Sequence, residues 1–272
     1  MSRMRDSARP EQSGEGSPTV EADPERLEEL PVEPSSDSIN PDAVLAGCPR
    51  TTWRPDPEVM ISFAGSGPAR GAEEFRLLRS RLYQLQGKHT LKSILIASAL
   101  PGEGKSFVAA NLARVLALQP NCRVLLIDAN LRSPRQHSVF GTSARPGFSE
   151  YLLQEVDEFG VMQKGGNEHL FLIPAGRDVA GPTELVANGR LKSLTDRLGP
   201  LFDWIIVDSP AALPVSDAGL LANHCDGVLM VVRSLSSPYD EVRKARGRFR
   251  EESLVGVVLN EIPARPPRSE TK

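Results

Sequence analysis

The sequence predicts an α/β fold, in which a mostly parallel sheet carries helices on both faces and follows a disordered N-terminal arm. Short apolar runs, such as "SILIAS" (93–98) and "WIIVDSP" (204–210), alternate with helical segments along the chain. These runs lack polar alternation, which is typical of strands buried on both faces. The first 60 residues are rich in Pro, Glu, Ser and Gly, and their few apolar residues show no period.

The elements follow one another in a regular order. An amphipathic helix comes first in "GAEEFRLLRSRLYQLQ" (71–86), where Phe75, Leu78 and Leu82 recur at helical spacing. Further helices are expected after Lys105 and over 148–154, 184–198, 216–225 and 238–252. Strands are expected over 93–98, 123–128, 170–176, 204–210, 227–233 and 254–261.

Three regions follow from this pattern. Residues 1–60 are expected to be the disordered arm, residues 71–261 the folded domain, and residues 262–272 a loose, Pro-rich tail. The length of 272 residues suits one α/β domain with an appendage.

The composition narrows the function classes. A net charge of -3 and a pI near 5.9 give no basic field of the kind that nucleic-acid binders carry. Cys48, Cys122 and Cys225 form no CxxC pair, so neither a zinc site nor a disulfide framework is expected. No apolar run reaches the roughly 18 residues of a membrane helix. We therefore expect a cytoplasmic protein.

The stretch "ALPGEGKS" (99–106) lies between the first predicted strand and a helix. Gly102 and Gly104 would let the backbone amides approach an anion, Lys105 would add a positive charge, and the Ser106 hydroxyl could bind Mg²⁺. The strict phosphate-loop pattern has Gly where this chain has Ala99, and the alternative is a Gly-rich turn with an incidental lysine. The predicted nucleotide-binding residues are Pro101, Gly102, Glu103, Gly104, Lys105, Ser106 and Phe107.

Two further strands end in an acid. Asp128 closes "VLLID" and Asp208 closes "WIIVD". The carboxyl ends of parallel strands meet along one edge, so Ser106, Asp128 and Asp208 can converge on one metal–phosphate site. Each acid alone could equally be a helix cap or a turn residue.

From about Gly71 to Glu261 the chain resembles the bacterial tyrosine kinases of the polysaccharide co-polymerase system, a branch of the P-loop ATPases that also includes the cell-division and partition ATPases. The resemblance is carried by "PGEGKSFVAANLA", "LLIDANLRSPRQHSVFG", "IPAGRDVAGPTELV", "FDWIIVDSPAALPVSDAGLLA", "GVLMVVR" and "GVVLNE".

The resemblance implies ATP and Mg²⁺ as cofactors. Lys105 and the loop amides would hold ATP, while Ser106, Asp128 and Asp208 would serve Mg²⁺. Asp128 would also accept a proton from an attacking tyrosine hydroxyl, and Arg132 would support the site electrostatically. A surface salt bridge is the alternative for Arg132. The implied catalytic residues are therefore Lys105, Asp128, Arg132 and Asp208.

The chain departs from the family pattern twice. Asn130 stands where the family has a second acid, so weaker Mg²⁺ binding or slower transfer is expected. The tail lacks the family's tyrosine cluster, which rules out tail autophosphorylation. Tyr83, Tyr151 and Tyr239 are the only tyrosines, and we expect packing or surface roles for them.

The first helix carries Glu73, Arg76 and Arg79, which match the family's oligomerisation element. Residues spaced by three share one side of a helix and could reach a second copy, and intrahelical ion pairing is the alternative. His137 also matches a family position, where a structural hydrogen bond explains it as well as catalysis does.

The leading hypothesis is an ATP- and Mg²⁺-dependent protein-tyrosine kinase domain that regulates exopolysaccharide synthesis or export. A membrane partner on a separate chain would recruit it to the inner face of the membrane. The second hypothesis is a nucleotide-gated assembly module with slow or absent transfer, supported by Asn130 and the missing tyrosines. A partition ATPase is a weaker third, because its extra loop lysine is missing.

Overall fold

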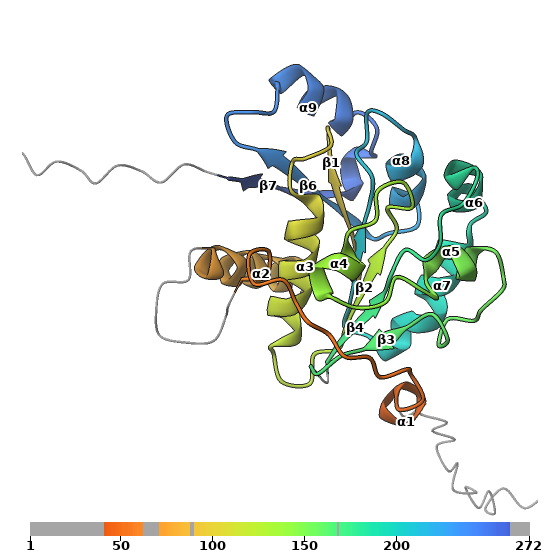
Figure 1. Ribbon diagram of the computed structural model, residues 1–272. Helices are drawn as coiled ribbons and strands as arrows, with labels where there is room; N and C mark the ends of the chain where they lie inside the picture. Colours follow the sequence, from red (N-terminus) through yellow and green to blue (C-terminus); the bar gives the residue numbers. More distant parts are fainter. Residues whose placement is uncertain (1–40, 62–70, 88–89, 168, 262–272) are drawn as a thin grey trace, which may run out of the picture. The chain divides into compact units, whose positions relative to one another are not determined.

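The computed structural model describes residues 41–61, 71–87, 90–167 and 169–261 (Figure 1). The helices are α1 (Pro41–Leu45), α2 (Ala72–Gln86), α3 (Lys105–Ala117), α4 (Gln136–Phe140), α5 (Phe148–Leu152), α6 (Pro182–Ala187), α7 (Arg190–Leu198), α8 (Asp217–Ala222) and α9 (Tyr239–Arg246), with the short 3₁₀ turns η1 (Gly199–Leu201) and η2 (Glu251–Ser253). The strands are β1 (Ser93–Ser98), β2 (Val124–Asp128), β3 (Gln163–Lys164), β4 (Leu170–Ile173), β5 (Trp204–Asp208), β6 (Gly227–Arg233) and β7 (Leu254–Asn260).

The strands form one sheet in the order β3-β4-β2-β5-β1-β6-β7 within the described part of the chain. All neighbours pair in parallel except β3 and β4, which are antiparallel. Apolar clusters cover both faces. One cluster joins the sheet to α2, α3 and α4, and the other joins it to α1 and to α5 through α9. The predicted α/β sheet with helices on both faces is confirmed.

Several predicted helices are shorter in the structure, and the segments 184–198 and 238–252 differ most. The segment 184–198 is divided into α6 and α7, because Gly189 between them has a φ of 76°. Only Gly and a few polar residues enter this region easily, so the turn interrupts the helix. Helix α9 ends at Arg246, and Gly247 follows it.

Order begins earlier than the sequence predicts. Residues 49–61, here called the strap, lie against the domain rather than forming the end of a disordered arm. The amides of Arg54 and Asp56 donate to the carbonyls of Phe140 and Val139, both at 2.9 Å. The side chain of Met60 is buried. The apolar residues of this stretch have no helical or strand period, although Trp53, Val59, Met60 and Ile61 pack against the same apolar cluster. The rest of the predicted arm (1–40) and the tail (262–272) lie outside the described residues.

Candidate functional site

The loop between β1 and α3 has the backbone of a phosphate cradle. Gly102 and Gly104 have φ values of 82° and 97°, which side chains disfavour. A Cβ at Gly104 would lie 2.0 Å from Nδ2 of Asn260, on β7. The loop therefore needs glycine at position 104 both for its dihedral angle and for the close approach of β7.

Glu103 holds this loop in shape. Its side chain is buried, Oε2 accepts a hydrogen bond from the Leu100 amide at 2.7 Å, and Oε1 accepts one from the Ser237 hydroxyl. Asn260 Nδ2 donates to its carbonyl oxygen at 3.1 Å. The Glu103 carboxylate is thus used within the protein. A part for Glu103 in nucleotide binding, as the sequence predicts, would fall to its main chain.

A cavity of about 430 Å³ opens beside the loop. This volume suits a small-molecule ligand. Six of the seven predicted nucleotide-binding residues line the cavity, and Glu103 is the exception. The full lining is Pro101, Gly102, Gly104, Lys105, Ser106, Phe107, Asn130, Arg132, Ser133, Arg135, Pro210, Ala211, Pro214 and Val215.

Lys105 is the first residue of α3 and is mostly buried. Burial lowers the pKa of its ammonium group, and the nearby carboxylates of Asp208 and Glu103 oppose this effect. A buried ammonium beside a cavity favours an anionic ligand, because the ligand would supply the counter-charge that water no longer provides.

Asp128 and Asp208 are direct neighbours in the sheet, since β2 and β5 pair in parallel with these residues in register. Both side chains are fully buried. Asp128 accepts hydrogen bonds from three backbone amides, those of Asn130 at 3.2 Å, Arg135 at 3.0 Å and Gln136 at 2.9 Å. Asp208 Oδ1 has no hydrogen-bond partner among the described residues.

Burial is the main cause that raises the pKa of both carboxyls, and the charge of Asp208 raises the pKa of Asp128 further. The Ser106 hydroxyl and the Gln136 amide lower the pKa of Asp208, but less than burial raises it. Two adjacent buried carboxylates, one with an unpaired oxygen, are unfavourable unless a cation joins them. Hydroxyl and carboxylate oxygens are also the ligands that Mg²⁺ prefers, so Ser106, Asp128 and Asp208 fit this ion.

Gln136 belongs to this site and was not predicted from the sequence. It begins α4 and is fully buried. Its Nε2 donates to Asp208 Oδ2 at 2.7 Å and to the carbonyl oxygen of Ser106 at 3.1 Å. No sequence pattern marks a lone glutamine as part of a site, and its partners lie 30 and 72 positions away along the chain.

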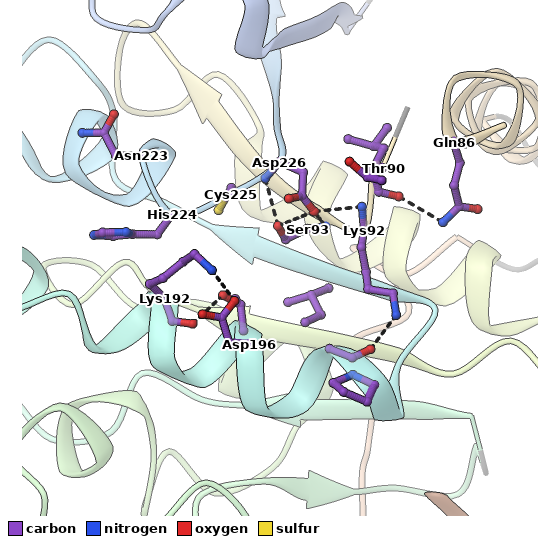
Figure 2. A pocket seen from close by; sticks show the side chains of 15 residues that line it. Gln86, Thr90, Lys92, Ser93, Lys192, Asp196, Asn223, His224, Cys225 and Asp226 are labelled. Carbon is purple, nitrogen blue, oxygen red and sulfur yellow. Dashed lines mark hydrogen bonds and ion pairs between the residues drawn. The ribbon is translucent and has the colours of Figure 1, made fainter. Parts of the chain in front are cut away.

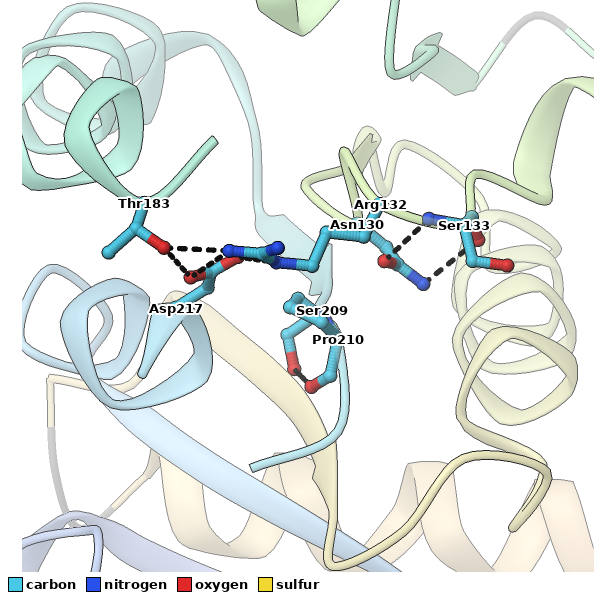
Figure 3. A network of polar contacts seen from close by, with 7 residues as sticks. All are labelled: Asn130, Arg132, Ser133, Thr183, Ser209, Pro210 and Asp217. Carbon is cyan, nitrogen blue, oxygen red and sulfur yellow. Dashed lines mark hydrogen bonds and ion pairs between the residues drawn. The ribbon is translucent and has the colours of Figure 1, made fainter. Parts of the chain in front are cut away.

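Arg132 lines the cavity but is held by other residues (Figure 3). Its Nε donates to Asp217 Oδ2 at 2.8 Å, and Nη2 donates to Thr183 Oγ1 at 2.7 Å. Asp217 lies on α8 and raises the pKa of the guanidinium. The salt bridge that the sequence left as an alternative is therefore present, and a catalytic role stays a prediction. Neither Asp217 nor Thr183 was singled out from the sequence.

Asn130 closes the turn after β2. Its Nδ2 donates to the Ser133 carbonyl at 2.9 Å, and its Oδ1 accepts from the Ser133 amide at 3.2 Å (Figure 3). Both ends of the side-chain amide are thus used within the turn. An acid at this position would face the Ser133 carbonyl with an oxygen in place of the amide donor.

The tyrosines have the packing and surface roles expected from the sequence. Tyr83 donates from its hydroxyl to Cys122 Sγ at 3.3 Å, and burial raises its pKa to about 12. Tyr151 is buried beneath the guanidinium of Arg190, which lies 4.7 Å from the ring centroid. Tyr239 is 76% exposed at the start of α9.

The predicted interface row on α2 makes contacts within the chain. Arg76 Nη1 lies 3.2 Å from Glu73 Oε2, and Arg79 Nη1 donates to the Val115 carbonyl of α3 at 3.0 Å. The intrahelical pair left as an alternative is present, and oligomerisation through this row stays a prediction. His137 Nε2 and Ser138 Oγ are 3.1 Å apart, which agrees with a structural hydrogen bond.

A larger cavity, of about 780 Å³, lies at the opposite edge of the sheet, near the amino ends of β1, β5 and β6 (Figure 2). Two of its charged side chains, those of Asp226 and Lys92, are hydrogen-bonded within the protein. Asp226 Oδ2 accepts from the amides of Lys92 and Ser93 and from the Ser93 hydroxyl, at 2.9, 2.7 and 2.9 Å. Lys92 Nζ donates to the Gly199 carbonyl at 2.6 Å. This cavity has no arrangement that would fit a triphosphate.

Two features are absent from the described residues. None of the helices there combines the length and apolar character that crossing a bilayer requires. No group of three His, Cys, Asp or Glu side chains gathers into a metal site within the same ranges. The candidate cation site thus has two carboxylates and a hydroxyl, and phosphate oxygens would have to complete it.

Comparison with known proteins supports the same fold. No protein-family model matches the chain. The septum site-determining protein MinD of Pyrococcus horikoshii, solved with Mg-ADP, is 20% identical to this chain. The superposition has a TM-score of 0.54 and covers 62% of this chain and 70% of that one. At this identity the likeness establishes the fold alone, which is that of the MinD-like P-loop ATPases.

Kinases are among the more similar proteins. The tyrosine-protein kinase YwqD of Bacillus subtilis is 34% identical over 191 residues, which are 70% of this chain and 80% of YwqD. The chimerical protein CapA2B2 is 30% identical with a TM-score of 0.70, over 82% of this chain and 98% of that one. The kinase domain of the Escherichia coli tyrosine kinase ETK is 30% identical with a TM-score of 0.66, over 74% of this chain and 81% of that one.

These likenesses agree with the motifs, the sheet order and the cavity beside the glycine loop. The chain belongs to the bacterial tyrosine-protein kinases of the P-loop ATPase fold.

Proposed function

We propose that this protein is an ATP- and Mg²⁺-dependent protein-tyrosine kinase that acts in exopolysaccharide synthesis or export. The observation that carries the proposal is the meeting of three separate segments at one edge of the sheet. The glycine loop with Lys105 and Ser106, the end of β2 with Asp128 and the end of β5 with Asp208 all lie there. This combination suits a triphosphate with its cation.

Each group has a distinct part in this mechanism. The loop amides and Lys105 bind the phosphates of ATP, and Ser106, Asp128 and Asp208 hold the cation. When bound, Mg²⁺ would neutralise charge on the transferring phosphoryl group. Phosphoryl transfer depends mainly on positioning and charge neutralisation, which these residues provide from rigid elements.

Asp128 has a second assignment by family resemblance, as the group that accepts the proton of the tyrosine hydroxyl. Its raised pKa favours proton uptake. However, the side chain is fully buried, and its oxygens accept three backbone hydrogen bonds. These contacts favour a role toward the cation over direct contact with a tyrosine.

We also propose that a membrane protein on a separate chain is the activating partner. This chain spans only 34% of a putative tyrosine-protein kinase in the cps region of Klebsiella pneumoniae and 27% of the kinase Wzc of Salmonella typhimurium. Those relatives carry long segments outside the matched region, and the proposal is that a membrane protein works together with this kinase.

A phosphate-transfer assay tests the assignment. The protein is incubated with labelled ATP, Mg²⁺ and the cytosolic segment of the partner, and tyrosine label and free phosphate are measured separately. Tyrosine labelling that disappears in Lys105→Met supports the proposal. Release of free phosphate with no labelled tyrosine would reject the kinase and leave only an ATPase.

A second candidate is a nucleotide-gated regulatory ATPase. The observation in its favour is that Tyr83 and Tyr151 are held by packing, which leaves Tyr239 as the one tyrosine that is mostly exposed in the described ranges. This candidate predicts that ATP changes the oligomeric size of the protein, as measured by light scattering. An unchanged size with and without nucleotide counts against it.

A further inference from the structure

Gln136 joins the three segments of the site. Its side-chain Nε2 donates to the Asp208 carboxylate on β5 and to the Ser106 carbonyl on α3, at 2.7 and 3.1 Å. Its backbone amide donates to Asp128 on β2 at 2.9 Å. One fully buried residue thus contacts each of the three residues that we assign to the cation.

Two buried oxygens at this point lack hydrogen-bond partners in the described part of the chain. They are Oε1 of Gln136 and Oδ1 of Asp208. Most buried polar atoms in proteins are paired, and an ion or a water that binds at the site is one explanation of an unpaired one. Oδ2 of Asp208 accepts the hydrogen bond of Gln136, and Oδ1 is left to contact a cation.

The position of Gln136 is itself well supported. Helix α4 is held at its far end by the strap, because Arg54 and Asp56 donate to the carbonyls of Phe140 and Val139. The Trp53 ring packs on Phe140, with ring centroids 4.9 Å apart. A residue on such a supported element can hold its partner in a fixed orientation.

We propose that Gln136 is a positioning residue for the cation. It turns the Asp208 carboxylate so that Oδ1 faces the cation, and it fixes the distance between Asp208 and the start of α3. Its own Oε1 is free to accept a hydrogen bond from a water of the hydrated ion. The inference rests on the proposed nucleotide and Mg²⁺ binding, which it deepens.

A titration of ADP into the full chain by calorimetry separates this role from a merely structural one. The affinity is measured with Mg²⁺ and with EDTA, and the ratio gives the gain due to the cation. In Gln136→Leu we expect the ADP affinity in EDTA to stay within about twofold of wild type. We expect the Mg²⁺-dependent gain to fall by tenfold or more, as is usual when a group that orients a metal ligand is removed.

Gln163→Leu is the matched control. Gln163 is also a buried glutamine, and it hydrogen-bonds Thr142 Oγ1 at 2.8 Å and the Ser143 carbonyl at 3.0 Å, with no contact to the three cation residues. The melting temperature should fall in this variant while the Mg²⁺-dependent gain stays at the wild-type value. If Gln136→Leu does not fold, Gln136→Asn keeps the amide but is too short to bridge Ser106 and Asp208, and the same loss of gain is expected.

The outcomes distinguish the two levels of the proposal. If wild type gains affinity with Mg²⁺ and a folded Gln136 variant gains equally, Gln136 has no positioning role and the proposed function stands. If Gln163→Leu loses as much of the Mg²⁺-dependent gain in ADP affinity as Gln136→Leu does, the inference is also overturned, because the loss would then follow from removing any buried glutamine. If wild type binds ADP no better with Mg²⁺, the proposed function fails and this inference fails with it.

Discussion

The amino and carboxyl edges of the sheet each carry an aspartate and a lysine, but these side chains differ in how fully their hydrogen bonds are formed. At the amino edge, Asp226 accepts three hydrogen bonds through one oxygen, and Lys92 donates to a carbonyl. At the carboxyl edge, Asp208 has an oxygen without a partner, and Lys105 is buried beside a cavity. The amino-edge cavity is the larger, at about 780 Å³ against 430 Å³. An unpaired carboxylate oxygen close to a buried ammonium, rather than cavity size, therefore identifies the candidate active site.

Substitution of the two lysines should give the largest contrast. Lys105→Met removes the one side-chain cation that the loop offers, so we expect ATP affinity and phosphoryl transfer to fall by about a hundredfold or more, on the order of 3 kcal/mol. Lys92→Met removes only a contact to the Gly199 carbonyl, so ATP affinity and the rate of phosphoryl transfer should stay within about twofold of wild type. Binding is measured by calorimetry and transfer by labelled ATP. Equal losses in the two variants would contradict the assignment of the carboxyl edge.

The two acids should respond to neutralisation with opposite signs. Asp226→Asn weakens three charge-assisted hydrogen bonds, and we expect the free energy of unfolding to fall by about 1 kcal/mol. Asp208→Asn relieves a buried repulsion with Asp128, so without Mg²⁺ the free energy of unfolding should rise by about 1 kcal/mol. Urea titrations of the nucleotide-free protein measure both.

The Asp208→Asn advantage should also depend on pH. The fold raises the pKa of Asp208 above that of the unfolded chain, so the folded wild type retains a proton that the unfolded chain loses. Wild-type stability therefore falls as the pH rises above about 4, the ordinary carboxyl pKa, and the variant escapes this loss. The stability advantage of Asp208→Asn over wild type should therefore grow as the pH rises above about 4. It should disappear when saturating Mg²⁺·ADP is bound. An advantage that shrinks with rising pH, or that persists with Mg²⁺·ADP, would contradict the prediction.

Asn130→Asp is expected to have an effect of similar size. A carboxylate oxygen would replace the amide that donates to the Ser133 carbonyl, and the free energy of unfolding should fall by about 1 kcal/mol without nucleotide. Asn223→Asp, at the amino-edge cavity, should change it by less than about 0.5 kcal/mol, because that side chain is exposed. Thermal melts provide the measurement. A more stable Asn130→Asp protein would show that the turn does not need the amide donor.

The thiol of Cys225 should give the smallest signal. It lines the amino-edge cavity but is buried, and burial raises its pKa far above the ordinary value. We expect it to resist iodoacetamide at pH 8 in the native protein and to react after denaturation, as mass spectrometry would detect. Rapid labelling of the native protein would mean that the amino edge also holds a reactive group.

Much of the site could be predicted from the sequence, because local patterns fix it. The glycine loop requires its glycines at given positions, and a strand that ends in an acid can be recognised in "VLLID" and "WIIVD". The strap and the division of 184–198 could not be read in this way. The strap has no period, and Gly189 ends a helix only because its φ is positive in the folded chain.

The amino-acid sequence by itself determined the order of the six predicted strands, the loop at 99–106 and the placement of Asp128 and Asp208 at strand ends, since these depend on neighbours in the chain. Tertiary structure alone decided that Gln136 contacts Asp208 and that Arg132 pairs with Asp217, contacts between residues 72 and 85 positions apart. Hydrogen bonds of that kind depend on how distant elements pack, because a polar atom takes whichever partner the fold brings within about 3 Å. No local pattern encodes that choice.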